Sequence, residues 1–460
     1  MREVIEKVNT ICNHFVWGPG MLLFFLLIGI WFTIRTKGFQ IFQWKLWMNH
    51  TLFAFLKDTN VRKTKDPKAI SQFQSFCTSL AATLGTGNIT GVAAAIVAGG
   101  AGAIFWMWVS AFFGMMTSYA ENVLGIRYRY KNSKGDWVGG AMVYMERGLN
   151  CRWLAILYSF FCIFVSFGMG NMTQANSIAS GLKSSFSIPP YIVGICLMAV
   201  VGLVLVGGVK RVASVTEKVV PFMAIFYIAG GIVVLIVNYQ EIPQAFQLIF
   251  KEAFQLKAVG GGVLGYGMRQ AVKMGVARGI FSNEAGLGSS VLVHAAADVK
   301  EPVVQGMWGI AEVFIDTIVV CTVTALVIIT TGVYEPQKFL NNIIKGVENV
   351  DGTTLTGQAF ATVIPWGDKF LSLAIVLFAF ATIIGWYYYG ERTMAYLMGE
   401  KSVSFYKICY IAMILPGCMA APDLIWDIAD TLNGCMAIPN LIALALLGKE
   451  VITATQEYLK

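Results

Sequence analysis

Long apolar stretches separated by short polar ones run along almost the whole chain. A helix needs about 20 consecutive apolar residues to cross a bilayer core of roughly 30 Å, and most of these stretches approach or exceed that length. The predicted spans are 17–34, 71–99, 101–125, 152–182, 190–208, 215–238, 263–298, 305–332, 369–390, 404–421 and 423–447. The pattern therefore predicts an all-α polytopic membrane protein with 11 transmembrane helices.

Two of these apolar segments are interrupted by glycine and polar residues. The first contains LGTGN at 84–88, and the second contains SNEAGLG at 282–288. Glycine disfavours a helix because it loses more conformational freedom on folding than any other residue. In a membrane, irregular backbone is tolerated only inside the protein or beside a water-filled cavity. Two such segments, each opening a set of five spans, are typical of a secondary transporter with an inverted repeat.

This layout divides the chain into five parts. No strong residue-level identity links the two sets of spans, so the repeat is inferred from the layout alone. The predicted parts are an extra transmembrane helix with a basic cytoplasmic loop (1–70), a first five-helix repeat (71–238), an extracellular connection (239–274), a second five-helix repeat (275–447) and a cytoplasmic tail (448–460).

Charge supports the membrane assignment and orients the chain. Only 13% of the residues are charged, whereas a soluble domain carries about a quarter. The net charge of +8 lies in loops between apolar spans, so we expect a lipid bilayer around the protein and no nucleic-acid partner. The loops on one side of the membrane are 35–70, 126–151, 209–214, 299–304 and 391–403. Lys and Arg concentrate in the first two of these loops. By the positive-inside rule that side is cytoplasmic, which puts the N-terminus outside and the C-terminus inside the cytoplasmic membrane of a prokaryote.

The interruption at 84–88 offers two complementary helix ends to a ligand. A helix that ends there exposes carbonyl groups, and a helix that begins there exposes N–H groups. A zwitterionic amino acid suits this arrangement, because its carboxylate can accept the free N–H groups while its ammonium faces carbonyls of the second interruption. The N–H groups are those near Gly85, Thr86 and Gly87, and the carbonyls are those around Ile280 and Phe281.

A cation can use the same interruption. Sodium prefers oxygen ligands, and the carbonyls around Ala82 and Leu84, with a hydroxyl from a neighbouring helix, would supply them. The competing interpretation is close helix packing, since Gly87 and Gly91 form a GxxxG pattern. The second glycine-interrupted segment favours transport over packing.

Several polar residues inside predicted spans have both structural and functional interpretations. Glu284 is a candidate for ion or proton coupling, but it can also cap the following half-helix or pair with Arg278. Glu312 and Asp316 are four residues apart, so they share one helical face and either relay a cation or stabilise the fold. His294 is either a packing residue or a proton carrier.

Other motifs and classes of function are disfavoured. The chain has no GxxxxGK[ST] motif, so it does not use ATP by itself, and it shows no nucleophile–base or metal cluster. We therefore predict that it is not an enzyme. An ion channel would need a continuous polar pore, and the asymmetric pair of interrupted helices argues against one. Gln174 can donate and accept hydrogen bonds, which suits either an amino-acid ligand or polar contacts between helices.

The run SLAATLGTGNITGVAAAIVAGGAGAIFWMWVSAFFGMMTSYAE resembles the signature region of the alanine or glycine:cation symporter family, the sodium/alanine symporters. The resemblance continues in GVARGIFSNEAGLGS, FIDTIVVCTVTALV, GWYYYGER and IADTLNGCMAIPNL, so it covers nearly the whole chain. It implies a leucine-transporter-type 5+5 inverted repeat with one extra helix. It also implies sodium-coupled uptake of a small neutral amino acid, alanine or glycine, with no partner protein required.

The resemblance also assigns residues to the substrate. These are Thr86 and Gly87 at the first interruption, next to Gly85, together with Gln174, Phe281, Asn283 and Trp386. Phe281 and Trp386 would be walls that limit the size of the substrate side chain. Such a filter is coarse, because one methylene changes selectivity by only about 1–3 kcal/mol. Glutamine or serine therefore remain alternative substrates.

For the coupling ion, the resemblance implies a sodium site between the first interrupted helix and the span 369–390. Thr382 is the expected hydroxyl ligand. Members of the family usually carry Ser or Thr where this chain has Ala381. Sodium would then be held more weakly, by backbone carbonyls and Thr382 alone, or coupling would use H⁺.

Overall fold

The computed structural model describes residues 2–254, 266–336, 352–420 and 422–460. Nearly all of them are helical, as the apolar pattern predicts. The first 70 residues form two consecutive helices and four short ones. They are α1 (Arg2–Val16), α2 (Pro19–Arg35), α3 (Phe39–Phe42), α4 (Trp44–His50), α5 (Ala54–Lys57) and α6 (Thr59–Arg62).

The first predicted repeat contains an interrupted helix followed by long ones. Its elements are α7 (Gln72–Thr83), a 3₁₀ turn (Thr86–Asn88), α8 (Thr90–Gly99), α9 (Gly102–Tyr128), the antiparallel strands β1 (Tyr130–Lys131) and β2 (Trp137–Val138), α10 (Ala141–Arg147), α11 (Arg152–Phe167), a π-helical turn (Gly168–Met172), α12 (Thr173–Phe186), α13 (Pro190–Val206) and α14 (Gly208–Val237).

The rest of the chain has a similar sequence of elements. A 3₁₀ turn (Tyr239–Glu241) and α15 (Ile242–Ala253) lie in the predicted connection. Then follow α16 (Tyr266–Asn283), α17 (Val291–His294), α18 (Pro302–Val313), a π-helical stretch (Phe314–Cys321), α19 (Thr322–Thr330), α21 (Gly352–Ala361), α22 (Gly367–Met398), α23 (Ser402–Ala412), α24 (Ile414–Met419) and α25 (Pro422–Tyr458).

Both predicted interruptions are present. Between α7 and α8 the helix is replaced by an extended residue and one 3₁₀ turn. Between α16 and α17 the backbone turns sharply, with positive φ at Glu284 (+57°), Gly286 (+95°) and Gly288 (+72°). Two of these three positions are glycine, the residue that adopts this region without steric cost. We call these two segments, 84–89 and 284–290, the first and second breaks.

Eight helical runs in the described part of the chain are long and apolar enough to cross a membrane. The helix α13 is apolar but shorter, and the two broken segments each divide into halves. Large apolar side chains on α14 point outward at helical spacing, as lipid contact requires; they are Phe222, Ile225, Ile232, Val233 and Ile236. The multi-pass membrane assignment follows from these runs and their exposed apolar faces.

Three stretches predicted as loops or tail are largely helical. The loop predicted at 209–214 is helical, because α13 and α14 are separated only by a turn in which Gly208 has φ +66°. Most of the loop predicted at 391–403 is also helical, since α22 continues to Met398. The helix α25 likewise runs through most of the predicted tail, 448–460. Helices longer than the apolar span extend past the hydrocarbon, and hydropathy alone does not detect that extension.

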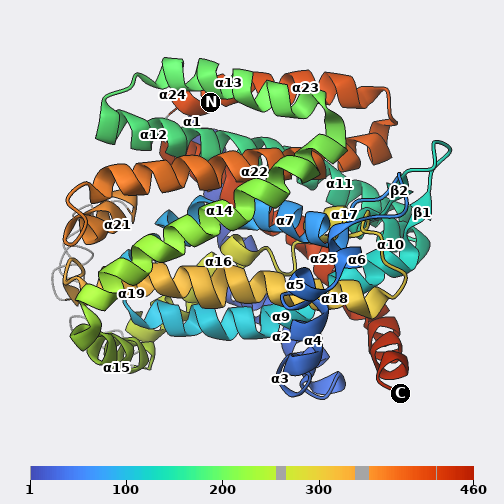
Figure 1. The fold of residues 1–460 in the computed structure, drawn as a ribbon, viewed down its shortest axis with the longest axis horizontal. Helices are drawn as coiled ribbons and strands as arrows, with labels where there is room; N and C mark the ends of the chain where they lie inside the picture. The colour runs from blue at the N-terminus through green and yellow to red at the C-terminus, as the bar shows by residue number, and fades with distance from the viewer. Residues whose placement is uncertain (1, 255–265, 337–351, 421) are drawn as a thin grey trace.

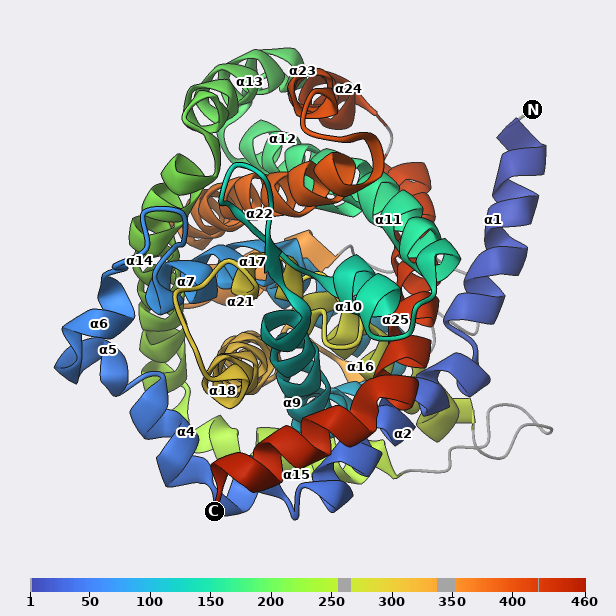
Figure 2. The same ribbon diagram turned by 90° about the vertical axis from the view of Figure 1, so that its right-hand side faces the viewer.

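The broken helices lie inside the bundle. The helix α7 packs between α14 and α22, and α16 packs along α9 and α8 (Figure 1). Seen from the end in Figure 2, α13, α23 and α24 lie on the outside, beyond α22. Residues 75–83 of α7 are all buried. Longer, unbroken helices therefore surround both breaks, as the backbone groups freed there require.

Candidate functional site

The first break is joined to α12 by Gln174. The Gln174 Oε1 atom accepts hydrogen bonds from the Thr86 N–H (3.4 Å) and the Thr86 hydroxyl (3.2 Å), and its amide group donates to the Met169 carbonyl (3.1 Å). The π-helical turn just before Thr173 shifts the helical register there. Two residues that the sequence assigned to one ligand are thus in contact, although they are far apart in the chain.

Two of the N–H groups predicted to be free at the first break, those of Gly85 and Thr86, have partners. The Gly85 N–H donates to the Thr83 carbonyl (2.8 Å) and to Asn88 Oδ1 (3.0 Å), and the Thr86 N–H is bound by Gln174. The carbonyl of Ile280, expected to face a ligand, accepts the Glu284 N–H (2.9 Å). A ligand that binds either of these two N–H groups must therefore replace a protein partner.

At Gly87 the first break lies next to the end of α16, just before the second break. A Cβ atom on Gly87 would lie 3.4 Å from the Phe281 ring and 3.5 Å from the Ser282 Cα atom, which is ordinary van der Waals contact. A Cβ on Gly91 would meet nothing within 4 Å. The GxxxG pattern therefore does not act as a helix-packing pair, because only its first glycine makes a close contact.

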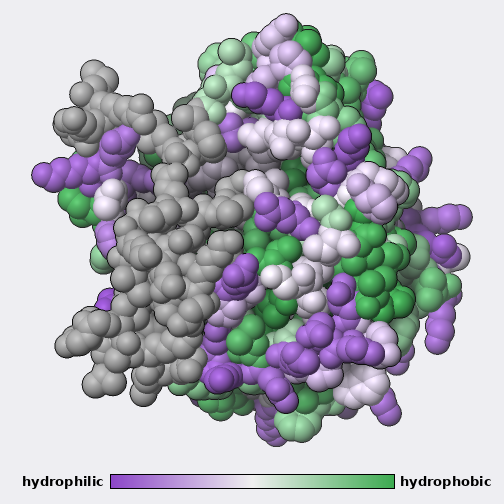
Figure 3. All heavy atoms as spheres, turned by 90° about the vertical axis from the view of Figure 1, so that its left-hand side faces the viewer, coloured by the Kyte–Doolittle hydropathy of each residue, from purple (hydrophilic) through white to green (hydrophobic). Residues whose placement is uncertain are grey.

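Phe281 lies between this contact and a cavity. The cavity, of about 690 Å³, is lined by α8, α12, α16, α21 and α22, and by Trp426, whose ring packs 5.9 Å from that of Phe281. It lies near the end of the molecule where α21 is found, which faces the viewer in Figure 3. The visible part of that end carries polar and apolar side chains side by side.

Asn283 and Trp386 have contacts with the second break rather than with Thr86. The Asn283 amide group donates to the Thr317 hydroxyl (3.0 Å), and its Oδ1 accepts the Ala285 N–H (3.0 Å). The Trp386 indole N–H donates to Glu284 Oε1 (2.9 Å), and a Cβ on Gly170 would overlap the Trp386 side chain. Both residues are buried, and each fixes part of the second break.

One interpretation of the sequence paired Glu284 with Arg278, and the structure does not show this pair. The second oxygen of Glu284 accepts the Ser289 hydroxyl (2.5 Å), which ties the two sides of the break together. Arg278 instead pairs with Asp430 of α25 (3.1 Å) at the cavity lining. Arg278 is six residues before Glu284 on a helix that ends between them, so the break turns the two side chains apart.

The second break is bound by a set of partners that the sequence analysis missed. Glu121 Oε1, from α9, accepts the N–H groups of Gly286 (3.1 Å) and Gly288 (3.0 Å). The Asn440 amide donates to the same oxygen (2.6 Å) and to the Gly286 carbonyl (2.9 Å), and the Tyr158 hydroxyl donates to the Gly288 carbonyl (2.5 Å). Side chains of three helices therefore satisfy the freed backbone groups.

Asp316 connects the two breaks and was only partly anticipated. Its carboxylate accepts hydrogen bonds from Asn88 of the first break (2.7 Å), from Ser282 beside the second (2.9 Å) and from Thr317 (2.7 Å). Glu312 has other hydrogen-bond partners, which are the Ser79 hydroxyl and His294. The sequence signal for Asn88 was present in LGTGN itself, where it is the one amide side chain.

A group of oxygen atoms marks the predicted cation site. The Thr382 hydroxyl of α22 lies 3.0 Å from the Ala81 carbonyl and 3.4 Å from the Leu84 carbonyl. Ala81 thus takes the position predicted for Ala82, which packs against Gly385 instead. The neighbouring Ala381 is buried and adds no hydroxyl. Carbonyl and hydroxyl oxygens from two helices, beside a helix C-terminus, suit a hard cation.

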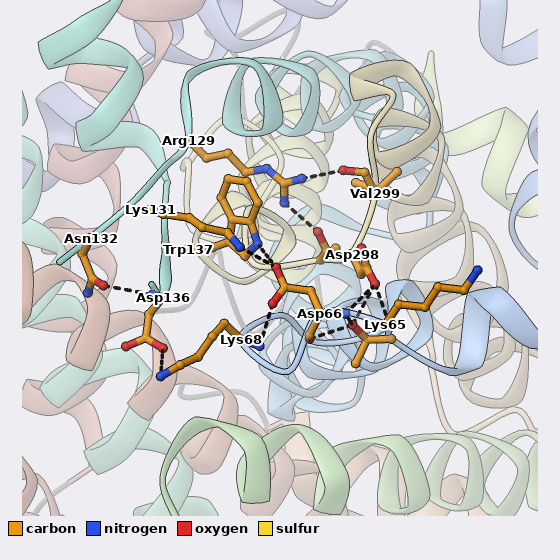
Figure 4. Close-up of polar contacts among 12 residues, drawn as sticks. Lys65, Asp66, Lys68, Arg129, Lys131, Asn132, Asp136, Trp137, Asp298 and Val299 are labelled. Atoms are coloured by element: carbon orange, nitrogen blue, oxygen red, sulfur yellow. Dashed lines mark hydrogen bonds and ion pairs between the residues drawn. The ribbon is translucent and has the colours of Figure 1, made fainter. Parts of the chain in front are cut away.

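At the end of the molecule opposite the cavity, polar contacts join three loops (Figure 4). Arg129 donates to the carbonyls of Ala295 (2.9 Å), Ala297 (2.6 Å) and Val299 (2.5 Å). Asp298 accepts the Thr64 hydroxyl and the Lys65 N–H, both at 2.8 Å.

Asp66 completes these contacts, with Lys131 at 2.8 Å and the Trp137 indole N–H at 3.2 Å. We call Asp66, Arg129, Lys131, Trp137 and Asp298 the loop cluster. It fastens the segments that lead into α7 and out of α17.

The charges of the loop cluster are stable at neutral pH. The hydrogen bond from Lys131 holds the pKa of Asp66 below its usual range. Burial tends to raise the pKa of Asp298, but hydrogen bonds from the Lys65 N–H and the Thr64 hydroxyl outweigh it, and the pKa is lowered. Burial lowers the pKa of Arg129 to about 10, so the guanidinium stays charged.

Comparison with known proteins identifies the family to which the chain belongs. The family model described as the sodium:alanine symporter family matches residues 2–460. The sodium/alanine symporter AgcS of Methanococcus maripaludis is 43% identical, over 99% of this chain and 97% of its own. The probable sodium/glutamine symporter GlnT of Bacillus subtilis is 38% identical, over 100% of this chain and 91% of its own.

Solved structures share the fold. The crystal structure of MhsT in complex with L-phenylalanine matches with a TM-score of 0.58 and 12% identity, over 83% of this chain and 90% of that chain. A sodium-coupled sialic acid symporter in an outward-open state matches with a TM-score of 0.52 and 12% identity, over 89% of this chain and 82% of that chain. The predicted leucine-transporter-type fold is confirmed.

The loop cluster yields a prediction about stability. Asp298→Asn removes a charged acceptor of several hydrogen bonds, and such bonds contribute about 1.5–3 kcal/mol each when buried and less when partly exposed. We expect a lower melting temperature than for Asp58→Asn, in which an exposed aspartate that bonds the nearby Asn60 is changed. Thermal unfolding in detergent measures both. Equal melting temperatures for the two variants would contradict this role of Asp298.

The same contact predicts a pH dependence. Because the pKa of Asp298 is lowered on folding, its contribution to stability is present above its usual value of 3.8 and is lost as the pH falls through the lowered value. The difference in melting temperature between wild type and Asp298→Asn should therefore be constant near neutral pH and shrink below about pH 4. A difference that grows on acidification would contradict the assigned charge.

Proposed function

Because the chain belongs to the sodium:alanine symporter family, we propose that it imports a small neutral amino acid, alanine or glycine, together with Na⁺ by alternating access. Secondary active amino-acid symport by a multi-pass membrane protein follows from the family and the fold. The observation that carries the finer proposal is the contact of Gln174 with Thr86 at the first break.

In this proposal the substrate carboxylate takes the place of Gln174 Oε1. A carboxylate oxygen is a stronger acceptor than an amide oxygen, and it would receive the Thr86 N–H and hydroxyl at the start of a half-helix, where the dipole favours an anion. The present distances of 3.4 and 3.2 Å are long for hydrogen bonds, so little is lost when Gln174 turns away. The displaced amide can then bind the ligand.

The size of the substrate is limited by what surrounds the break. A Cβ atom on Gly87 would reach van der Waals contact with Phe281, and the Trp386 side chain fills the space beside Gly170. This crowding supports alanine or glycine. Glutamine is the second candidate, because a relative that is 38% identical is named as a probable sodium/glutamine symporter.

Sodium would bind to the Thr382 hydroxyl and to the carbonyls of Ala81 and Leu84. The hydroxyl would have to turn its hydrogen away from these carbonyls and offer its oxygen to the ion. Leu84 lies two residues before Thr86, so sodium and substrate would order the same turn of backbone. Each ligand then raises the affinity for the other by the same factor.

Orientation follows from charge and from the two ends of the molecule. The loop cluster lies at the end that carries the basic loops 35–70 and 126–151, which we assign to the cytoplasm. The 690 Å³ cavity near the other end would then face the outside of the cytoplasmic membrane. Release of the substrate inward would require the loop cluster to open.

Uptake into proteoliposomes tests the proposal. With an inward sodium gradient, the wild-type protein should concentrate radiolabelled alanine inside the vesicles, and without the gradient it should only equilibrate it. Glycine, serine and glutamine compete as unlabelled substrates in the same assay. Accumulation of alanine that ignores the imposed sodium gradient would refute sodium coupling.

Thr382→Val tests the cation site. The exchange keeps the shape of the side chain but removes a ligand, and a loss of about 1.4 kcal/mol corresponds to a tenfold weaker affinity. We expect the sodium concentration for half-maximal uptake to rise about tenfold, with a smaller change in the alanine KM at saturating sodium.

The matched control is Thr330→Val, whose buried hydroxyl bonds the Leu326 carbonyl of its own helix. This variant should keep the wild-type sodium dependence. If both valine variants show the same sodium dependence, Thr382 is not a ligand.

A further inference from the structure

A buried histidine–carboxylate pair lies beside the breaks and takes no part in the proposed binding of substrate or sodium. His294 Nε2, at the end of α17, lies 3.2 Å from Glu312 Oε2 on α18, and neither side chain is exposed. The other Glu312 oxygen accepts the hydroxyl of Ser79 on α7. The pair therefore connects inner parts of both broken segments.

The hydrogen bonds around His294 indicate which of its two ring nitrogens carries a proton. The Gln305 amide nitrogen lies 2.5 Å from His294 Nδ1 and 3.0 Å from the Ser75 hydroxyl. An amide nitrogen only donates, so Nδ1 accepts and the single imidazole proton is on Nε2, which donates to Glu312. His294 is neutral in this arrangement, and the pair carries one negative charge.

One atom of this network has no partner among the described residues. Gln305 Oε1 is buried and accepts no hydrogen bond from them. A buried acceptor without a donor costs free energy, so the site lacks a hydrogen that this atom could receive. If the Gln305 amide turns over, Oε1 comes to Nδ1 and can accept from a protonated His294. The network can thus hold one more proton than it does now.

Three more acidic side chains lie near the pair. Glu121 of α9, Glu284 of the second break and Asp316 are all buried and close enough to interact electrostatically with Glu312. The Tyr389 hydroxyl of α22 faces Ser79 at 3.4 Å. Among the described residues, no Lys or Arg is hydrogen-bonded to His294, Glu312 or Gln305.

The position of α7 affects how readily His294 binds the extra proton. The Ser75 hydroxyl donates to the Gln72 carbonyl (2.8 Å), so its oxygen faces Gln305 as an acceptor. After the amide turns over, Gln305 Oε1 would face that acceptor unless Ser75 gave up its bond to Gln72. When α7 moves away, this conflict disappears.

We propose that His294 is a proton-binding site that takes up its proton when α7 moves away from its present position. In this site His294 is hydrogen-bonded to Glu312 and to Gln305. The proposal rests on alternating access as proposed above, and it adds that α7 moves when the loop cluster opens. By linkage, a proton that binds better to the displaced state also favours that state. Acidification should therefore loosen α7.

Hydrogen–deuterium exchange of the full-length protein in nanodiscs measures this directly. After correction for the intrinsic exchange rate, the protection of residues 72–83 should fall between about pH 8 and pH 6, the range in which histidine titrates. His294→Gln should remove this pH dependence. His50→Gln, which changes a histidine on α4 that bonds the Leu46 carbonyl, should keep it.

Gln305→Glu provides a second variant of nearly the same shape. A carboxylate beside Nδ1 favours the protonated imidazole, so the transition in α7 protection should move to higher pH by about one unit or more. A residue with only a packing role would not move the transition. If His294→Gln does not fold, this shift decides the question.

The proposal is overturned if wild-type protection does not change over this pH range, if His294→Gln keeps the wild-type pH dependence, or if Gln305→Glu leaves the transition in place. Sodium-driven alanine uptake is measured on the same preparations. A failure of uptake would count against the proposed function, whereas the exchange data would still test the proton site.

Discussion

The structure depends on one constraint, which is that backbone N–H and C=O groups freed inside a membrane must find partners. The two breaks meet this constraint in different ways. At the second break, Glu121, Asn440 and Tyr158 bind the freed groups at distances of 2.5–3.1 Å. At the first break, the N–H and hydroxyl of Thr86 are held by two long contacts from Gln174. The second break is thus satisfied by the protein, and the first is the place where a ligand can improve on what the protein supplies.

This asymmetry connects the parts of the molecule. Asp316 ties Asn88 of the first break to Ser282 beside the second, so a change at one break reaches the other. The cation oxygens of Ala81 and Leu84 lie on the same turn as Thr86. Further along α7, Ser75 and Ser79 touch the network around His294 and Glu312. A movement of α7 therefore alters the proposed substrate, sodium and proton sites together, and the loop cluster holds α7 in place from its other end.

The sequence predicted the breaks well because clustered glycine and polar residues inside an apolar span are costly in an unbroken membrane helix. Gln174 was identified as a candidate site residue through the family resemblance rather than through the spacing of residues. The sequence did not predict which partners the breaks would have. Arg278 pairs with Asp430 instead of Glu284, because the chain turns between them. Glu312 and Asp316 bind different partners although they are only four residues apart. Such contacts depend on how helices distant in sequence are packed, and hydropathy carries no information about that packing.

The most direct test of this account is a structure of the protein determined with alanine and sodium. The account predicts density for the amino acid with its carboxylate at the Thr86 N–H and hydroxyl, with the Gln174 amide displaced from its present contact. It also predicts an ion between Thr382 and the carbonyls of Ala81 and Leu84. Alanine bound elsewhere, with Gln174 still on Thr86, would contradict the central claim that the first break is the binding site.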